Sequence, residues 1–380
     1  MSERGATVTP VDLVVLGGGC AGLSLAARLA DLAAPPTVRV LEARTEYAND
    51  RTWSFWAPRE HEWSDIASHR WDTWRFSTPQ TTALHRPTAD VSYHALAADR
   101  FAEAMRKRID QHDNVELVLG TTVDSVTRER SAYRVATDGG DLLAHHVVDT
   151  RPTPAAPSAY GQRFVGHEVE FSADRFDPAE AGLMLDMQAD DLGFRFTYVL
   201  PFSERHALIE ETRFGRVGST ARLEHDLDVS VEQIADGADV QMLRREGGFL
   251  PMTTAAPPAA TDGVITAGIR AGAARASTGY AFLRIQRWAH LNAARLAAGD
   301  VPISHPAEPT WRRLVDGLFL QVLDQRPELA PEIFSALGER LRPETLARFL
   351  SDDARLVDFA HVVQALPKLP FLRELVRSSR

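Results

Sequence analysis

The sequence has very little cysteine and no long apolar run. Its 380 residues include one cysteine, Cys20, which excludes an intrachain disulfide and a multi-cysteine zinc or iron–sulfur site. No run of about 18 consecutive apolar residues occurs, so the chain is not expected to span a bilayer. The first residues, MSERGATVTPVD, lack the apolar centre of a secretory signal. These absences together predict a cytoplasmic protein.

Basic residues are also fewer than acidic residues. Lys and Arg total 42 against 52 Asp and Glu, and the resulting net charge of -10 disfavours nucleic acid as a partner. The 13 histidines show no spacing typical of a metal site. His145 and His146 are adjacent in a predicted strand and therefore point to opposite faces. We expect neither nucleic acid nor a metal ion to bind.

A glycine cluster near the start is the first positive signal. The β-branched run 11–16, VDLVVL, is followed by a match to G-x-G-x-x-G and then by helical periodicity. In this pattern Gly17 permits the tight turn, Gly19 lets a pyrophosphate approach the backbone, and Gly22 lets helix and strand pack closely. Glu42 ends the next apolar run, where its carboxylate can accept hydrogen bonds from ribose hydroxyls. The pattern predicts a βαβ unit that binds a dinucleotide.

A second segment favours FAD over NAD as that dinucleotide. Residues 264–289 read as a strand, a loop of small residues and a long helix, and such a loop can offer N–H groups to a phosphate or a ring edge. We list Gly268 and Gly279 from this loop as cofactor contacts. Asp149, at the end of the strand in VVDTRP, and Arg51, after the second strand of the βαβ unit, are further candidates.

The remaining chain divides by its periodicity. A helix is predicted over 95–109 and antiparallel strands over 115–137. Between about 165 and 209 four strand-like stretches follow one another, and from Leu283 the pattern is helical almost to the end. No internal repeat or low-complexity linker marks a domain boundary.

Several longer motifs resemble a known family, the bacterial lycopene cyclases of the flavoprotein type. The resemblance extends from about residue 11 to 372, and one departure is Ala276, where family members often have proline. Its motifs follow the glycine loop in the order DRTWSFW (50–56), LPFSERHALIEETRF (200–214), EGGFLPM (246–252), ASTGYAF (276–282) and ALPKLPFL (365–372).

The resemblance implies an α/β fold like that of the aromatic hydroxylases. A Rossmann-type FAD-binding fold would be interleaved with an antiparallel substrate sheet and followed by a helical carboxy-terminal part. We expect one globular body, 1–380. Its FAD-binding segments would be about 11–57, 95–152 and 262–300, its substrate sheet about 160–255 and its helical part about 300–380.

The resemblance also implies a reaction, the closing of an acyclic end of lycopene to a β-ionone ring. This conversion is an isomerisation without net redox change, yet it requires reduced FAD, with NAD(P)H as the electron donor. The expected products are γ- or β-carotene. Two rivals share the fold and the glycine loop: an FAD-dependent monooxygenase and a reductase, either acting on an isoprenoid or aromatic substrate.

Ring closure of this kind needs an acid that stays protonated, and the motif IEET offers Glu210 and Glu211. Side chains alternate along a strand, so Glu210 shares a face with Leu208 and Phe214, whereas Glu211 lies on the other face with Arg213. Apolar neighbours keep a carboxylic acid neutral, and an arginine keeps it ionised. We therefore predict Glu210 as the acid. The motif as a whole is the catalytic candidate, because a β-bulge would exchange the two faces.

The intermediate cation needs negative charge or aromatic faces beside it. Trp53, Trp56 and Tyr280 are the candidates for the substrate pocket, with the two tryptophans as a wall between flavin and hydrocarbon; ordinary core packing is the alternative for each ring. Trp63 has no predicted role. Glu246 is a weaker acid–base candidate, for which a structural hydrogen bond to loop amides is the alternative.

A substrate such as lycopene or a related carotene dissolves in the bilayer, so the enzyme must reach it there. The helices predicted after residue 300 are amphipathic, and the tail 366–380, LPKLPFLRELVRSSR, combines apolar and basic residues. We expect peripheral contact with the inner face of the cell membrane. Helices that only cover the core, with a frayed basic end, are the alternative.

Overall fold

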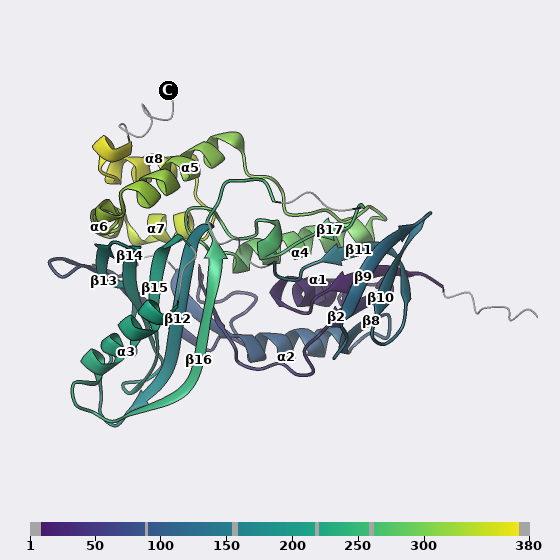
Figure 1. Ribbon diagram of the computed structural model, residues 1–380, viewed down its shortest axis with the longest axis horizontal. Coiled ribbons are helices and arrows are strands. Elements are labelled where there is room, and N and C mark those ends of the chain that lie inside the picture. The colour runs from purple at the N-terminus through teal and green to yellow at the C-terminus, as the bar shows by residue number, and fades with distance from the viewer. Residues whose placement is uncertain (1–8, 88–89, 154–158, 217–219, 258–261, 372–380) are drawn as a thin grey trace, which may run out of the picture.

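Two large β-sheets form the framework of the structure, a computed structural model. In Figure 1 the first sheet lies at one end of the long axis, and the second lies at the other end, beside the carboxy-terminal helices. A smaller sheet has the order β3-β7-β4 and consists of β3 (Thr52–Ala57), β4 (His69–Trp71) and β7 (Ser92–Ala97). The described residues are 9–87, 90–153, 159–216, 220–257 and 262–371.

The first sheet has the order β8-β2-β1-β11-β10-β9, with β17 beside β11. Its central strands are parallel, and β9 and β10 form an antiparallel hairpin at one edge. The prediction of antiparallel strands over 115–137 is therefore right for β9 and β10 and wrong for β8, which pairs parallel with β2 because a helix precedes it. The bounds are β1 (Val11–Leu16), β2 (Val38–Glu42), β8 (Val115–Leu119), β9 (Val123–Glu129), β10 (Ala132–Thr137), β11 (Leu142–Asp149) and β17 (Ile265–Thr266).

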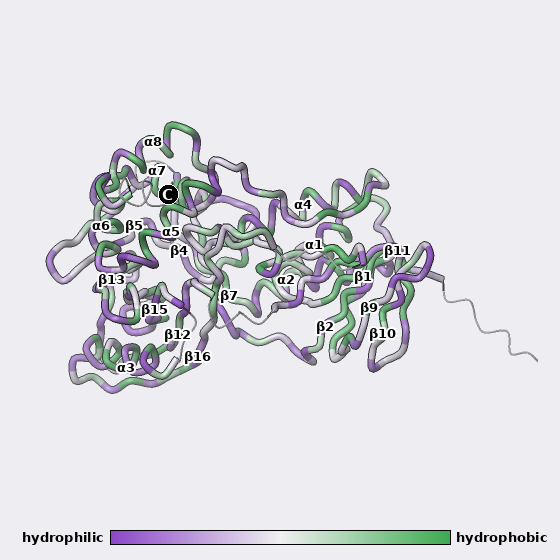
Figure 2. The backbone as a smooth tube through the Cα atoms, turned by 45° about the horizontal axis from the view of Figure 1, so that its top comes forward, coloured by the Kyte–Doolittle hydropathy of each residue, from purple (hydrophilic) through white to green (hydrophobic). Residues whose placement is uncertain are grey.

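Three helices pack with this sheet: α1 (Cys20–Ala30), α2 (Ala98–Ile109) and α4 (Phe282–Ala297). Helix α1 is rich in alanine and leucine, which favour helix, and it is buried along almost its whole length between the sheet and the other two helices. Figure 2 shows this apolar centre as green chain around α1 and β1. The helix predicted over 95–109 begins at Ala98, because residues 95–97 end strand β7.

The second sheet has the order β16-β12-β15-β14-β13-β5-β6. All four stretches predicted as strands between 165 and 209 lie in it, and β15, which carries the IEET motif, pairs antiparallel with β12 and with β14 without interruption. The bounds are β5 (Thr73–Ser77), β6 (Thr82–His85), β12 (Tyr160–Phe171), β13 (Glu180–Asp190), β14 (Gly193–Pro201), β15 (His206–Arg216) and β16 (Val240–Pro251).

Helices cover both faces of the second sheet. Helix α3 (Ala221–Ala235) packs on one face through Leu227 and Ala235. The other face meets an apolar cluster shared with the helices that follow residue 309, as the helical periodicity predicts. They are α5 (Thr310–Gln325), α6 (Ala330–Arg340), α7 (Pro343–Leu350) and α8 (Leu356–Ala365). Among the described residues, none of the helices is both long and apolar enough to cross a membrane.

Candidate active site

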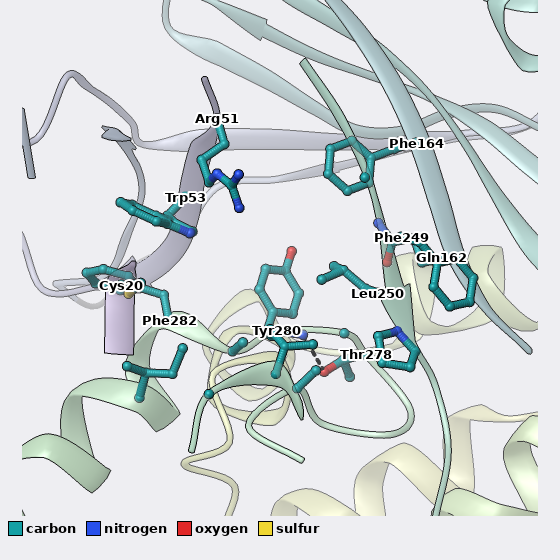
Figure 3. A pocket seen from close by; sticks show the side chains of 18 of the residues that line it. Cys20, Arg51, Trp53, Gln162, Phe164, Phe249, Leu250, Thr278, Tyr280 and Phe282 are labelled. Carbon is teal, nitrogen blue, oxygen red and sulfur yellow. Dashed lines mark hydrogen bonds between the residues drawn. The ribbon is translucent and has the colours of Figure 1, made fainter. Parts of the chain in front are cut away.

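One large cavity joins the glycine loop to the second sheet. Its volume is about 1570 Å³, more than the roughly 300–1,000 Å³ typical of a pocket for one drug-sized ligand. At one end it is lined by the glycine loop and residues after β2, and at the other by aromatic and aliphatic side chains of the second sheet and carboxy-terminal helices. Figure 3 shows Arg51 and Trp53 on one side, Phe164 and Phe249 on the other, and Tyr280 between them. The volume suits two ligands that meet in the middle.

The glycine loop has the geometry that its spacing predicts. Gly17 has a φ of 94°, a left-handed value that favours glycine. A Cβ on Gly22 would lie 2.0 Å from the Gly17 carbonyl oxygen, so only glycine fits there. A Cβ on Gly19 would meet nothing within 4 Å, which leaves the start of α1 open toward the cavity. The first N–H groups of a helix have no partner within it and attract anions.

Glu42 lies beside this loop with both carboxylate oxygens engaged. One accepts the Gly18 N–H at 2.7 Å, and the other accepts the backbone and side chain of Arg44 at 2.9 and 3.0 Å. The hydroxyl of Tyr47 also donates to the Gly18 carbonyl at 2.8 Å. Glu42 therefore fixes the loop, and its predicted bond to a ribose remains a prediction. Arg44 and Tyr47, which also line the cavity, were not predicted from the sequence.

The second predicted loop approaches the first. Gly268 has a φ of 74°, and a Cβ there would lie 3.5 Å from that of Ala21 in α1. Its N–H donates to Nε2 of His305 at 3.0 Å. Burial, with a smaller effect of Arg284, lowers the pKa of His305 to about 3, so this nitrogen remains an acceptor at neutral pH. Gly279, with a φ of 75°, also lines the cavity.

Arginines on the cavity wall are held from behind by Asp149. Its carboxylate is buried and accepts hydrogen bonds from Arg151 at 2.9 and 3.0 Å and from Arg270 at 2.7 Å. Both arginines line the cavity, whereas the lining does not include Asp149. Its predicted cofactor contact remains a prediction, and the geometry gives it a positioning role. Arg51 lines the cavity directly and pairs with Asp50 at 3.0 Å.

The two predicted tryptophans belong to different packing groups. Trp53 contacts Phe101 and Phe282 near the first sheet, with ring centroids 5.1 and 5.9 Å apart. Trp56 is buried with the second sheet's cluster and lies 5.3 Å from the ring of Tyr280. Both line the cavity, and the buried Trp63 does not. The proposal that the two tryptophans form a wall between flavin and hydrocarbon remains a prediction. Trp53 lies toward the first sheet and Trp56 toward the second.

Three tyrosine hydroxyls meet beside this wall. The Tyr93 hydroxyl lies 2.8 Å from that of Tyr198 and 3.3 Å from that of Tyr280. Burial raises the pKa of all three phenols well above the usual range, so they remain neutral. Tyr93 and Tyr198 were not predicted from the sequence. With Tyr280 they place three hydroxyl groups together on the cavity wall, next to Glu210, the cross-strand partner of Tyr198.

Glu210 faces the cavity from β15, together with Leu208, Thr212 and Phe214. It is 9% exposed. Burial first, and then the neighbouring carboxylate of Glu246, raise its pKa well above the ordinary value. Both effects favour the protonated form of Glu210.

Glu211 lies on the opposite face, under α3, as strand alternation predicts. It is fully buried, and one of its oxygens accepts the hydroxyls of Thr197 and Ser230, both at 2.6 Å. The expected pairing with Arg213 is wrong, because that arginine binds Asp190 and Asp226 instead.

The nearest cation to Glu211 is Arg195, at 3.7 Å. Burial raises the pKa of Glu211, the direction opposite to the one expected from a neighbouring arginine. Its hydroxyl partners belong to β14 and α3. Glu211 thus joins the helix to the sheet on the side away from the cavity.

The comparison with protein families identifies this arrangement. The model of the family "Lycopene cyclase protein" matches residues 12–376. The chain belongs to the lycopene cyclase family. Among its relatives, this lycopene cyclase family member is 28% identical to the lycopene beta-cyclase of Pseudescherichia vulneris, over 94% of this chain and 95% of the relative.

Solved structures show the same fold at low identity. A geranylgeranyl bacteriochlorophyll reductase-like protein from Thermoplasma acidophilum superposes with a TM-score of 0.62 and 13% identity, covering 97% of this chain and 99% of that one. A probable FAD-dependent monooxygenase from Pseudomonas aeruginosa superposes with a TM-score of 0.57 and 14% identity, covering 94% and 100%. The expected fold class, that of the FAD-dependent aromatic hydroxylases, is confirmed for this lycopene cyclase family member.

Proposed function

We propose that the protein is a lycopene beta-cyclase that closes acyclic ends of lycopene, or of a related carotene, to β-ionone rings. The observation that carries the proposal is the buried Glu210, whose pKa is raised, on the wall of a largely apolar cavity that continues to a dinucleotide-type glycine loop. Apolar surroundings keep a carboxylic acid neutral, so it still carries the proton that it can transfer to an alkene.

The residues supply each step of an isomerisation. The O–H bond of Glu210 breaks as a C–H bond forms at the terminal double bond of the substrate. The tertiary cation that results is attacked by the next double bond along the chain. This attack closes the six-membered ring and moves the positive charge onto a ring carbon. Loss of a ring proton to a carboxylate then restores a double bond. Atoms and electrons balance without an oxidant, in agreement with a reaction that has no net redox change.

Residues around the chamber can protect the cation. Trp56 and Tyr280 present aromatic faces to the cavity, and the phenols of Tyr93 and Tyr198 remain neutral, so they do not quench the cation as phenolates. Aromatic and aliphatic side chains of the second sheet exclude water, which would otherwise trap the cation as an alcohol. They include Phe76, Phe164, Leu183, Phe196, Leu208 and Phe214.

The residues at the other end of the cavity fit FAD. The open start of α1 at Gly19 and the side chains of Arg151 and Arg270 suit a pyrophosphate, and the loop at Gly268 suits a ring edge. Reduced FAD, with NAD(P)H as electron source, would supply negative charge beside the developing cation. In the described part of the chain, no three His, Cys, Asp or Glu side chains are grouped to hold a metal ion.

The assay for this function uses lycopene in lipid vesicles with protein, FAD and NAD(P)H, in parallel under air and under anaerobic conditions. We expect a product of unchanged mass with a shortened chromophore, read by mass spectrometry and absorption. Product formation should require the reduced flavin without consuming NAD(P)H in proportion. A product heavier by one oxygen, a product heavier by two hydrogens, or NAD(P)H consumption equal to product would instead support the monooxygenase or the reductase and contradict the cyclase.

We also propose that helices α5 and α8 touch the membrane surface on the cytoplasmic side. Trp311, Leu314, Leu356 and Val363 of these helices are exposed, and Leu356 and Leu314 are 78% and 70% exposed. Val315 and Val363 of the same helices line the cavity, so an apolar path from a bilayer would enter here. The basic end of the tail, 372–380, lies outside the described residues.

The membrane proposal predicts the effect of making this face polar. The double variant Leu314→Ser/Leu356→Ser should bind lipid vesicles more weakly in a flotation assay, by about 100-fold or more if both leucine side chains insert fully, since each loses burial worth roughly 1.5–3 kcal/mol. The control is Leu192→Ser, a similarly exposed leucine in the turn after β13, away from these helices. Equal loss of binding in both variants, or in neither, would refute a role for α5 and α8.

A further inference from the structure

A row of residues crosses four strands of the second sheet at Glu210. Tyr198 of β14 is the cross-strand partner of Glu210 in β15, Glu210 is the partner of Gly166 in β12, and Gly166 is the partner of Glu246 in β16. The three side chains of this row all line the cavity. Two carboxyl groups therefore stand on the same face with only a glycine between them.

Gly166 is the reason that the two carboxyl groups can meet. A Cβ at this position would lie 2.7 Å from Cγ of Glu210 and 3.4 Å from Cγ of Glu246. Both side chains thus lean over the space that any other residue would fill. Two carboxylates so close cannot both be ionised at little cost, and such pairs share one proton.

The surroundings decide which of the two carries the charge. Arg244 forms an ion pair with Glu246, and Thr52 donates to the same oxygen of Glu246 at 3.1 Å. Arg244 is also held by Glu168, whose other oxygen contacts His206 at 2.8 Å.

Ionisable groups from several strands lie around Glu210 and Glu246. The ionisable or charged groups that face the pair are Tyr198 from β14, Arg244 from β16 and Glu168 from β12, with His206 of β15 behind Glu168. None of these except Arg244 brings a positive charge next to the pair, and Arg244 lies on the side of Glu246. Arg244 therefore favours the negative charge of the pair on the side of Glu246 and the proton on the side of Glu210.

We infer that Glu246 and Glu210 act as a one-proton pair across Gly166, and that Glu246 is the positioning residue that keeps the proton on Glu210. The inference rests on the proposed ring closure. Glu210 loses its proton to the terminal alkene carbon, and the pair then carries two negative charges opposite the substrate cation. When the ring C–H bond breaks, its proton returns to a carboxylate oxygen of the pair. The pair holds one proton before and after the reaction.

The test is Glu246→Gln, which removes the negative charge that helps to raise the pKa of Glu210. That pKa should fall, so the alkaline limb of the pH profile of kcat, where Glu210 deprotonates, should move to lower pH by about one unit or more. Each unit lowers the protonated fraction on that limb about tenfold. Glu246→Asp keeps the charge and should return the limb toward its original position.

The matched control is Glu168→Gln, which takes away the other carboxylate of Arg244 without touching Gly166 and should leave the alkaline limb in place. A limb unmoved in Glu246→Gln, or moved equally in Glu168→Gln, would overturn the inference. A uniform loss of kcat with lower stability and no shift would do the same, because it would show a merely structural Glu246.

A second readout does not depend on turnover. The infrared carbonyl band of protonated Glu210, isolated as the difference between the spectra of the wild type and Glu210→Gln, should be lost at lower pH when Glu246→Gln is introduced. If the wild-type protein makes no cyclic product but the band titrates in this way, the pair stands and the proposed function fails. If ring closure occurs and the band in Glu246→Gln titrates as in the wild type, the function stands and the pair fails.

Discussion

Glu210→Gln should abolish ring closure while the protein still folds and binds its flavin. The amide has nearly the same shape but no acidic proton, so the step that creates the cation is lost. Loss of a general acid typically lowers the rate by about 10²–10⁴-fold, and we expect kcat in the vesicle assay to fall near the upper end because the neighbouring carboxyl, Glu246, is paired with Arg244. The flavin absorption spectrum and the thermal unfolding midpoint should remain close to those of the wild type.

Glu211→Gln is the matched control, since it makes the same change one residue along the same strand. Glu211 lies on the face toward α3 and bonds Thr197 and Ser230, so this variant should keep ring closure and lose only about 1 kcal/mol of the free energy of unfolding. Ring closure that survives in Glu210→Gln and disappears in Glu211→Gln would show that the acid is on the other face. Activity retained in both variants would remove the IEET motif from the chemistry.

Local patterns in the sequence predicted much of this site. Glu210 and Glu211 point to opposite faces because side chains alternate along a strand. The pairings of β15 with β12 and β14 contain no bulge that would change this. The glycine loop and Glu42 are likewise parts of one βαβ unit, whose geometry follows from spacing within a short segment. Where a feature depends on neighbours a few residues away, periodicity was sufficient.

Features that depend on the register between strands far apart in the sequence could not be predicted from it. The contact of Glu210 with Glu246 needs β12 to lie between β15 and β16 with Gly166 opposite both, and no local pattern specifies this. The wrong partner chosen for Glu211 has the same origin. Arg213 is near in sequence, but Asp190 and Asp226 reach it from other segments. A cation pairs with the carboxylates that folding brings to it, and sequence distance does not rank them.

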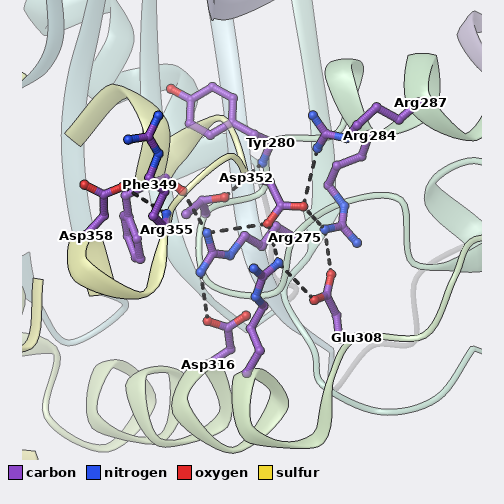
Figure 4. A network of polar contacts seen from close by, with 12 residues as sticks. Arg275, Tyr280, Arg284, Arg287, Glu308, Asp316, Phe349, Asp352, Arg355 and Asp358 are labelled. Atoms are coloured by element: carbon purple, nitrogen blue, oxygen red, sulfur yellow. Dashed lines mark hydrogen bonds and ion pairs between the residues drawn. The ribbon is translucent and has the colours of Figure 1, made fainter. Parts of the chain in front are cut away.

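Arg275 should be a costly residue to lose, because it is a buried cation at the centre of a polar network (Figure 4). It is 1% exposed, donates to the Phe349 carbonyl at 2.7 Å and lies 3.5 Å from Asp316. Its guanidinium also stacks on the Phe349 ring, 4.6 Å from the centroid. Arg275→Met would leave Asp316 buried without this charge, and breaking a buried pair in this way costs about 3–5 kcal/mol. Urea unfolding should show this loss as a lower midpoint.

Two further variants separate the charge from the packing. Arg275→Met/Asp316→Leu removes both charges and should recover most of the lost stability, since an apolar pair of similar volume often replaces a buried ion pair at little cost. Arg205→Met breaks an exposed pair with Asp174 and should change the free energy of unfolding by less than about 1 kcal/mol. A double variant as unstable as Arg275→Met would locate the effect in the Phe349 contacts instead.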